Sequence, residues 1–124
     1  MPRLSSRLWP LALCFAAACG ASSTGPSNPP DMVGDINIVQ GAEFLTTGAF
    51  DPNPKTVTLG DGGGVRWVNR DGTTHEMMSD NAAFPTSGLI RAGDTYSITL
   101  SKAGTYHYHC AIHPNMVGTI TVTP

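Results

Sequence analysis

The segment 105–119, TYHYHCAIHPNMVGT, constrains the fold of this chain more than any other. Its first residues alternate in polarity as a β-strand does, and the alternation ends at Cys110. His113 and Met116 follow at intervals of three residues, and a second strand-like run begins directly afterwards. A thiolate, an imidazole and a thioether placed so closely between two strands predict a metal-binding loop.

A second imidazole, that of His75, stands 35 residues before Cys110 and therefore belongs to a different strand or its end. One thiolate, two imidazoles and one weakly bound thioether are the ligand set of blue-copper electron-transfer sites. We therefore predict that His75, Cys110, His113 and Met116 bind one copper ion. Since the mixed set suits both Cu(I) and Cu(II) and leaves no open position, it predicts one-electron cycling rather than catalysis on a substrate.

Each of these residues has a simpler interpretation when it is taken alone. His75 follows an Asp-Gly turn, where surface or capping histidines are common, and Met116 has the character of a core residue. Cys110 by itself could be a small buried apolar side chain. A zinc site could use the histidines and the cysteine, but it would give Met116 no role.

The rest of the chain predicts an all-β fold. With 14 glycines, 10 prolines and short runs rich in Val, Ile, Thr and Tyr, it favours seven or eight short strands in one Greek-key β-sandwich. We place this copper-binding domain at residues 35–124. The expected strands are Ile36–Gln40, Thr47–Phe50, Thr56–Leu59, Val65–Asn69, Thr74–Ser79, Thr95–Leu100, Thr105–Cys110 and Gly118–Thr123.

Alternation along the strand before the cysteine sorts its side chains onto two faces. Tyr106, Tyr108 and Cys110 share one face, and His107 and His109 share the other. If the cysteine points inward, both histidines point to solvent. His109, beside the predicted ligand, is either a second route for electrons or an ordinary surface histidine.

The N-terminus has the pattern of an export signal. Arg3 and Arg7 precede eleven apolar residues, 8–18, which are too few to span a bilayer and which end in three alanines. We predict a signal peptide at 1–18 and a flexible Gly/Ser/Pro-rich tether at 19–34. Cys19, the first residue after the cleavage site, is either lipidated, as in bacterial lipoproteins, or the spare thiol of a secreted protein. In both cases Cys110 is the only cysteine of the domain and has no disulfide partner there.

The charge balance excludes one class of partner. The formal net charge of -2 becomes -4 when Arg3 and Arg7 leave with the signal peptide, and the remaining basic residues do not cluster. We therefore expect no nucleic-acid binding.

Four stretches resemble the cupredoxins of the plastocyanin and amicyanin type: GAEFLTTGAFDPNP, VRWVNRDGTTH, SGLIRAGDTYSITL and GTYHYHCAIHPNMVGTITV. The short interval from His113 to Met116 is more similar to the amicyanin loop than to the longer plastocyanin loop. The resemblance implies a type 1 site with His75, Cys110 and His113 in a plane and Met116 as axial ligand. Glu76 departs from the Asn or Thr that often follows the first ligand, although its backbone N–H could still donate to the cysteine sulfur as in the family.

The favoured function is thus a periplasmic, non-enzymatic electron shuttle. It is either a soluble monomer or a lipoprotein anchored through Cys19. Its expected partners are redox proteins such as a c-type cytochrome or a copper or heme oxidoreductase. The alternative is a copper-binding protein that stores or delivers the metal, with redox cycling incidental. A buried thiolate site holds its ion firmly and favours the shuttle, whereas delivery proteins use exchangeable Met and His sites.

Overall fold

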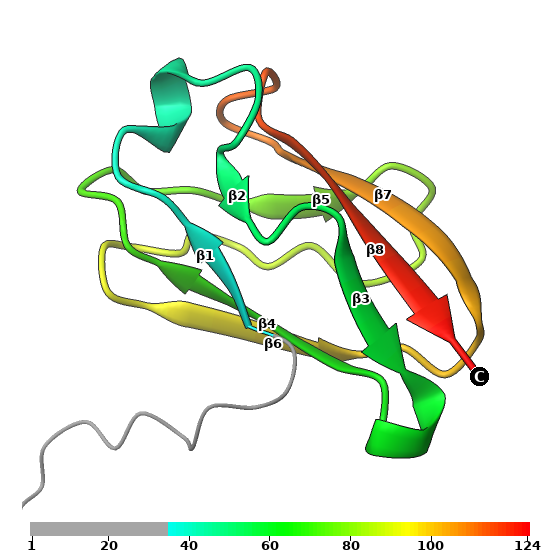
Figure 1. Ribbon diagram of the computed structural model, residues 1–124. Coiled ribbons are helices and arrows are strands. Elements are labelled where there is room, and N and C mark those ends of the chain that lie inside the picture. Colours follow the sequence, from blue (N-terminus) through cyan, green and yellow to red (C-terminus); the bar gives the residue numbers. More distant parts are fainter. Residues whose placement is uncertain (1–34) are drawn as a thin grey trace, which may run out of the picture.

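The computed structural model describes residues 35–124, which form two four-stranded β-sheets packed face to face (Figure 1). The predicted signal peptide and tether, and with them Cys19, lie outside the described residues. The strands are β1 (Asp35–Ile38), β2 (Phe50–Asp51), β3 (Lys55–Thr58), β4 (Gly64–Asn69), β5 (Met77–Ser79), β6 (Thr95–Thr99), β7 (Gly104–Cys110) and β8 (Val117–Thr123). Two short 3₁₀ turns, η1 (Ala42–Phe44) and η2 (Leu59–Asp61), complete the described elements.

The strand order is β2-β1-β4-β6 in one sheet and β3-β8-β7-β5 in the other. Two neighbouring pairs run parallel, β1 with β4 and β3 with β8, and the remaining pairs are antiparallel. Connections that cross from one sheet to the other produce this order, so the predicted all-β Greek-key sandwich is confirmed.

All eight expected strands are present, with bounds that shift by a few residues. The strand expected at Thr47–Phe50 shares only Phe50 with β2, and the strand expected at Thr74–Ser79 is shorter, because β5 begins only at Met77. His75 instead forms an isolated bridge with Ile90, and each residue donates its backbone N–H to the carbonyl of the other. The bridge gives the backbone of His75 the hydrogen bonds that a ladder would have supplied.

Aromatic side chains from both sheets meet in the core. The ring of Tyr108 on β7 lies 4.9 Å from that of Phe50 on β2 and 5.2 Å from the indole of Trp67 on β4, measured between centroids. Tyr108 and Cys110 are almost fully buried, as the alternation predicted, while Tyr106 is half-buried at the edge of the core. Trp67 is fully buried as well. Burial of these large rings supplies much of the hydrophobic stabilisation of the sandwich.

One end of the sandwich gathers segments that are distant in sequence. In Figure 1 the η1 turn and the loop between β7 and β8 lie together at the end opposite η2. Asn115, in that loop, donates its side-chain amide to the carbonyls of Glu43 and Leu45 at 3.1 and 2.8 Å. Within residues 35–124 no helix has the length and apolarity needed to cross a bilayer.

Candidate metal centre

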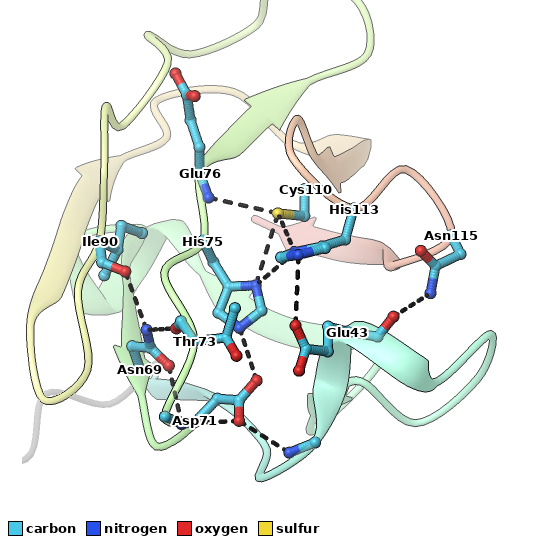
Figure 2. Close-up of polar contacts among 12 residues, drawn as sticks. Glu43, Asn69, Asp71, Thr73, His75, Glu76, Ile90, Cys110, His113 and Asn115 are labelled. Carbon is cyan, nitrogen blue, oxygen red and sulfur yellow. Dashed lines mark hydrogen bonds and ion pairs between the residues drawn. The ribbon is translucent and has the colours of Figure 1, made fainter.

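The side chains of His75, Cys110 and His113 converge on one point, as predicted (Figure 2). The cysteine Sγ lies 3.7 Å from Nδ1 of each histidine, and the two Nδ1 atoms are 3.3 Å apart. His75 and Cys110 are fully buried, whereas the His113 side chain keeps 20% of its surface exposed. Of the His, Cys, Asp and Glu side chains in the described residues, these three form the only cluster suited to a metal ion.

The size of this triangle fits a first-row transition metal. Bonds of about 2.0 Å to imidazole nitrogen and 2.3 Å to thiolate sulfur, as zinc makes, place such donor atoms about 3.4–3.8 Å apart when the ion lies at the centre of the triangle that they form. The three observed separations agree with this range to about 0.1 Å. The donor set of one thiolate and two imidazoles is the set that copper takes in blue electron-transfer sites.

Two hydrogen bonds close the ligand loop between β7 and β8. The backbone N–H of Cys110 donates to the carbonyl of Met116, and that of Met116 donates to the carbonyl of His113, both at 3.0 Å. Pro114 stiffens the loop between them because its ring fixes φ. The loop is therefore short and closed on itself, which limits how far the ligands move.

Met116 ends this loop and is fully buried. Met116 stands six residues after Cys110 and three after His113 in the sequence. This position is consistent with the predicted axial ligand. That role stays a prediction.

His75 is held by a carboxylate on the side of its ring away from the cluster. Its Nε2 lies 2.9 Å from Oδ2 of Asp71, and both side chains are at most 3% exposed. Desolvation raises the pKa of Asp71, but hydrogen bonds from the Gly41 N–H, from His75 and from the Gly72 N–H outweigh it, and the pKa lies below its usual value. An ionised Asp71 can only accept a hydrogen bond, so the tautomer of His75 that suits this contact has its proton on Nε2 and leaves the lone pair of Nδ1 for a metal.

Asn69 fixes the turn that carries Asp71. Its side-chain amide donates to the carbonyls of Thr73 and Ile90, at 2.8 and 3.0 Å, and its oxygen accepts the N–H of Asp71. The segment that holds His75 is thereby tied to the segment that contains Ile90. This network positions the first ligand of the cluster before any metal binds.

The cysteine sulfur accepts one backbone hydrogen bond. The N–H of Glu76 lies 3.4 Å from Sγ of Cys110, as the resemblance implied, and the Glu76 side chain turns away from the cluster (Figure 2). An N–H donor withdraws electron density from a ligating thiolate and so tunes the metal it binds.

His113 meets a second carboxylate. Its Nε2 lies 3.7 Å from Oε2 of Glu43 on η1, and both side chains are partly buried, at 20% and 25% exposure. Each histidine of the cluster therefore has a carboxylate beside the ring nitrogen that faces away from the triangle.

The two other histidines of the domain point away from the cluster, as the alternation predicted. His107 is exposed and lies 3.2 Å from the Thr119 hydroxyl. Nδ1 of His109 lies 2.6 Å from a carboxylate oxygen of Asp80 at the surface. Neither ring belongs to the cluster.

Sequence reasoning missed the residues that hold the ligands. Asp71 carried a usable signal, since it stands four residues before His75 in an Asp-Gly turn. Glu43 stands 70 residues before His113, and no local pattern links the two. Asn69 and Asn115 likewise act through tertiary contacts.

Comparisons with known proteins agree with this architecture. A family model described as a cupredoxin-like domain matches residues 12–122. Amicyanin from Paracoccus denitrificans is 29% identical over 122 residues, which cover 90% of this chain and 92% of amicyanin. Plastocyanin from Scenedesmus fuscus is 34% identical over 100 residues, covering 71% of this chain and 99% of plastocyanin.

A solved structure gives the same result in three dimensions. The purple cupredoxin from Nitrosopumilus maritimus superposes with a TM-score of 0.66 at 26% identity, covering 73% of this chain and 99% of the other. His75, Cys110 and His113 thus form a candidate copper site in a sandwich of the same kind. The chain belongs to the cupredoxin-like family and is a cupredoxin of the plastocyanin and amicyanin type.

Proposed function

We propose that the protein is a one-electron carrier that works outside the cytoplasm with a single type 1 copper ion. His75, Cys110 and His113 would hold the ion, with Met116 as a weak axial ligand. The observation that carries the proposal is the triangle formed by one buried cysteine sulfur and two imidazole nitrogens at separations of 3.3–3.7 Å. When bound, copper supplies a Cu(I)/Cu(II) couple that exchanges one electron.

The protein's part is to keep the ligands still while the charge of the site changes. His75 is anchored by Asp71 and by its bridge to Ile90, and Cys110 lies at the end of β7 with its sulfur on the Glu76 N–H. A preset site needs little rearrangement between oxidation states, which favours fast electron exchange.

The surface around His113 suits transient docking. Every large apolar side chain that is exposed in residues 35–124 adjoins a residue of the site: Phe44 follows Glu43, Leu89 precedes Ile90, Ile112 precedes His113 and Val117 follows Met116. Their exposed fractions range from 44% to 81%. Exposed apolar side chains that neighbour site residues in the sequence favour a protein partner there. We expect a redox protein such as a c-type cytochrome or a copper or heme oxidoreductase.

The visible spectrum of the Cu(II)-loaded protein tests the site. We expect an intense red-region band that makes the protein blue or purple, bleaches with ascorbate and is lost in Cys110→Ser. Colourless protein with weak, exchangeable copper would overturn the assignment. Met116→Leu tests the axial ligand separately, because it should keep the thiolate band while shifting its position and the reduction potential.

Storage or delivery of copper is the competing function. Fast, reversible electron exchange between the loaded protein and a c-type cytochrome supports the carrier. Facile transfer of Cu(I) to a copper-free acceptor, without such exchange, supports delivery. The buried thiolate favours the carrier, because the ion must leave a site whose donors include two fully buried side chains.

We further propose export through the segment 1–18 and anchoring through Cys19 by way of the tether 19–34. The apolar run and the cysteine that follows it support this placement. Mass spectrometry of protein from a membrane fraction tests it: a diacylglyceryl mass on Cys19, lost in Cys19→Ser, is expected. Unmodified protein in the soluble periplasmic fraction would contradict anchoring and leave the monomeric shuttle.

A further inference from the structure

Glu43 lies beside the one ligand of the cluster that reaches the surface. Its Oε2 is 3.7 Å from Nε2 of His113, a separation too long for a hydrogen bond but within the range of an ion pair. Figure 2 shows the carboxylate pointing at the ring from η1. Both side chains are three-quarters buried or more, so solvent screens their attraction less than at an open surface.

The backbone around Glu43 is fixed at both of its ends to the metal centre. The Gly41 N–H donates to Oδ1 of Asp71, whose other oxygen contacts His75. Asn115, two residues after His113, donates to the carbonyls of Glu43 and Leu45. The segment 41–45 therefore bridges the two histidine ligands, which lie 38 residues apart in sequence.

The position of the carboxylate has a definite electrostatic consequence. A metal on Nδ1 of His113 leaves the imidazole proton on Nε2, which then faces Glu43. The ring becomes more positive when the bound ion gains a charge, so a fixed negative charge beside Nε2 favours the oxidised site. The same contact opposes rotation of the ring away from the metal.

We propose that Glu43 is a positioning residue of the copper centre, which holds His113 on the ion and lowers the reduction potential. The inference rests on the proposed copper function of the same site. Glu43 on η1 would act on His113 as Asp71 acts on the buried His75. In each pair a carboxylate lies beside the ring nitrogen that faces away from the metal. Unlike Asp71, Glu43 does so at the surface through which we expect electrons to pass.

Glu43→Gln and Glu76→Gln form a matched pair of tests. Each removes one negative charge close to the site, but the Glu76 side chain turns away from the cluster (Figure 2). We expect Glu43→Gln to raise the midpoint potential clearly more than Glu76→Gln at the same pH and salt. Release of Cu(I) to a chelator should be roughly two- to fivefold faster in Glu43→Gln only, the factor expected for a partly exposed ion pair.

Glu43→Asp completes the set because it keeps the charge on a shorter side chain. Its potential should lie nearer to that of the wild type than the potential of Glu43→Gln does. Equal potentials and equal release rates in Glu43→Gln and Glu76→Gln, with the thiolate band intact, would overturn the role of Glu43 alone. Failure of the wild-type protein to show that band would overturn the proposed function itself.

Discussion

Oδ2 of Asp71 lies 2.9 Å from Nε2 of His75, with both side chains almost completely buried. The other oxygen of the same carboxylate accepts the N–H groups of Gly41 and Gly72 at 2.9 and 2.8 Å. One carboxylate thus orients a histidine ligand and fixes two turns. Its pKa is lowered because the hydrogen bonds from Gly41, His75 and Gly72 favour the ionised form and outweigh desolvation.

We therefore predict an acid-dependent loss of stability that Asp71→Asn removes. The folded-state pKa lies below the unfolded value of about 4, so the contribution of Asp71 is complete above about pH 4 and is lost as pH falls through the folded-state pKa. At pH 7 the asparagine variant of the copper-free protein should be less stable by about 1.5–3 kcal/mol, because a charged acceptor is lost. Denaturant unfolding between pH 6 and 3 should give it a shallower pH dependence than the wild type.

Asp61→Asn is the control, since that aspartate is exposed on η2 at the far end of the sandwich. It should keep the stability and the acid slope of the wild type. If Asp71→Asn kept them as well, the contact with His75 would have no energetic weight in the copper-free protein.

The strands and two members of the ligand triangle, Cys110 and His113, could be predicted because they depend on local pattern. Alternation placed Cys110 inward and His107 outward, and the interval from Cys110 to His113 set the reach of one short loop. His75 was found by its chemistry, as the one imidazole outside the cysteine segment. Residue type and spacing are enough for such features since the side chains act close to their own backbone.

The carboxylates behind the histidines could not be predicted in the same way. Glu43 reaches His113 only because η1 folds over the loop between β7 and β8, and a sequence does not display that approach. The start of β5 at Met77 has a similar cause, because Ile90, in a long irregular connection, takes the hydrogen bonds of His75. Such details depend on how segments distant in the chain meet.

A glycine on β8 is required by the core, and this gives a second prediction. A Cβ built on Gly118 would lie 2.2 Å from the ring of Tyr108, directly across the β7–β8 ladder. Gly118→Ala must displace a fully buried ring and should destabilise the domain by about 1–3 kcal/mol. Thermal unfolding should show the loss, with Gly60→Ala as control because its Cβ would make only an ordinary contact at 3.8 Å. Equal melting temperatures for the two variants would show that the ring of Tyr108 moves aside without cost.

Tyr108 also predicts how the copper-free domain responds to alkali. Its hydroxyl is buried and, like Nε1 of Trp67, has no hydrogen-bond partner in the structure. Burial raises the pKa of Tyr108 well above its usual value, and a polar contact with the Trp67 side chain, which falls outside normal hydrogen-bond geometry, lowers it only in part. The folded state thus favours the neutral phenol, whose contribution is complete below the unfolded pKa of about 10 and is lost as pH rises towards the folded-state pKa.

Tyr108→Phe should remove that alkaline loss and preserve stability at neutral pH, because it deletes a buried hydroxyl that makes no hydrogen bond. Tyr106→Phe is the matched control: its hydroxyl is near the surface, where it donates to the carbonyl of Lys102. Denaturant unfolding between pH 8 and 11 should show the wild type and Tyr106→Phe losing stability together while Tyr108→Phe changes less. If stability fell with pH at the same slope in all three proteins, the phenol of Tyr108 would not control alkaline unfolding. If Tyr108→Phe lost several kcal/mol of stability at pH 7, its hydroxyl would have a partner in the folded protein.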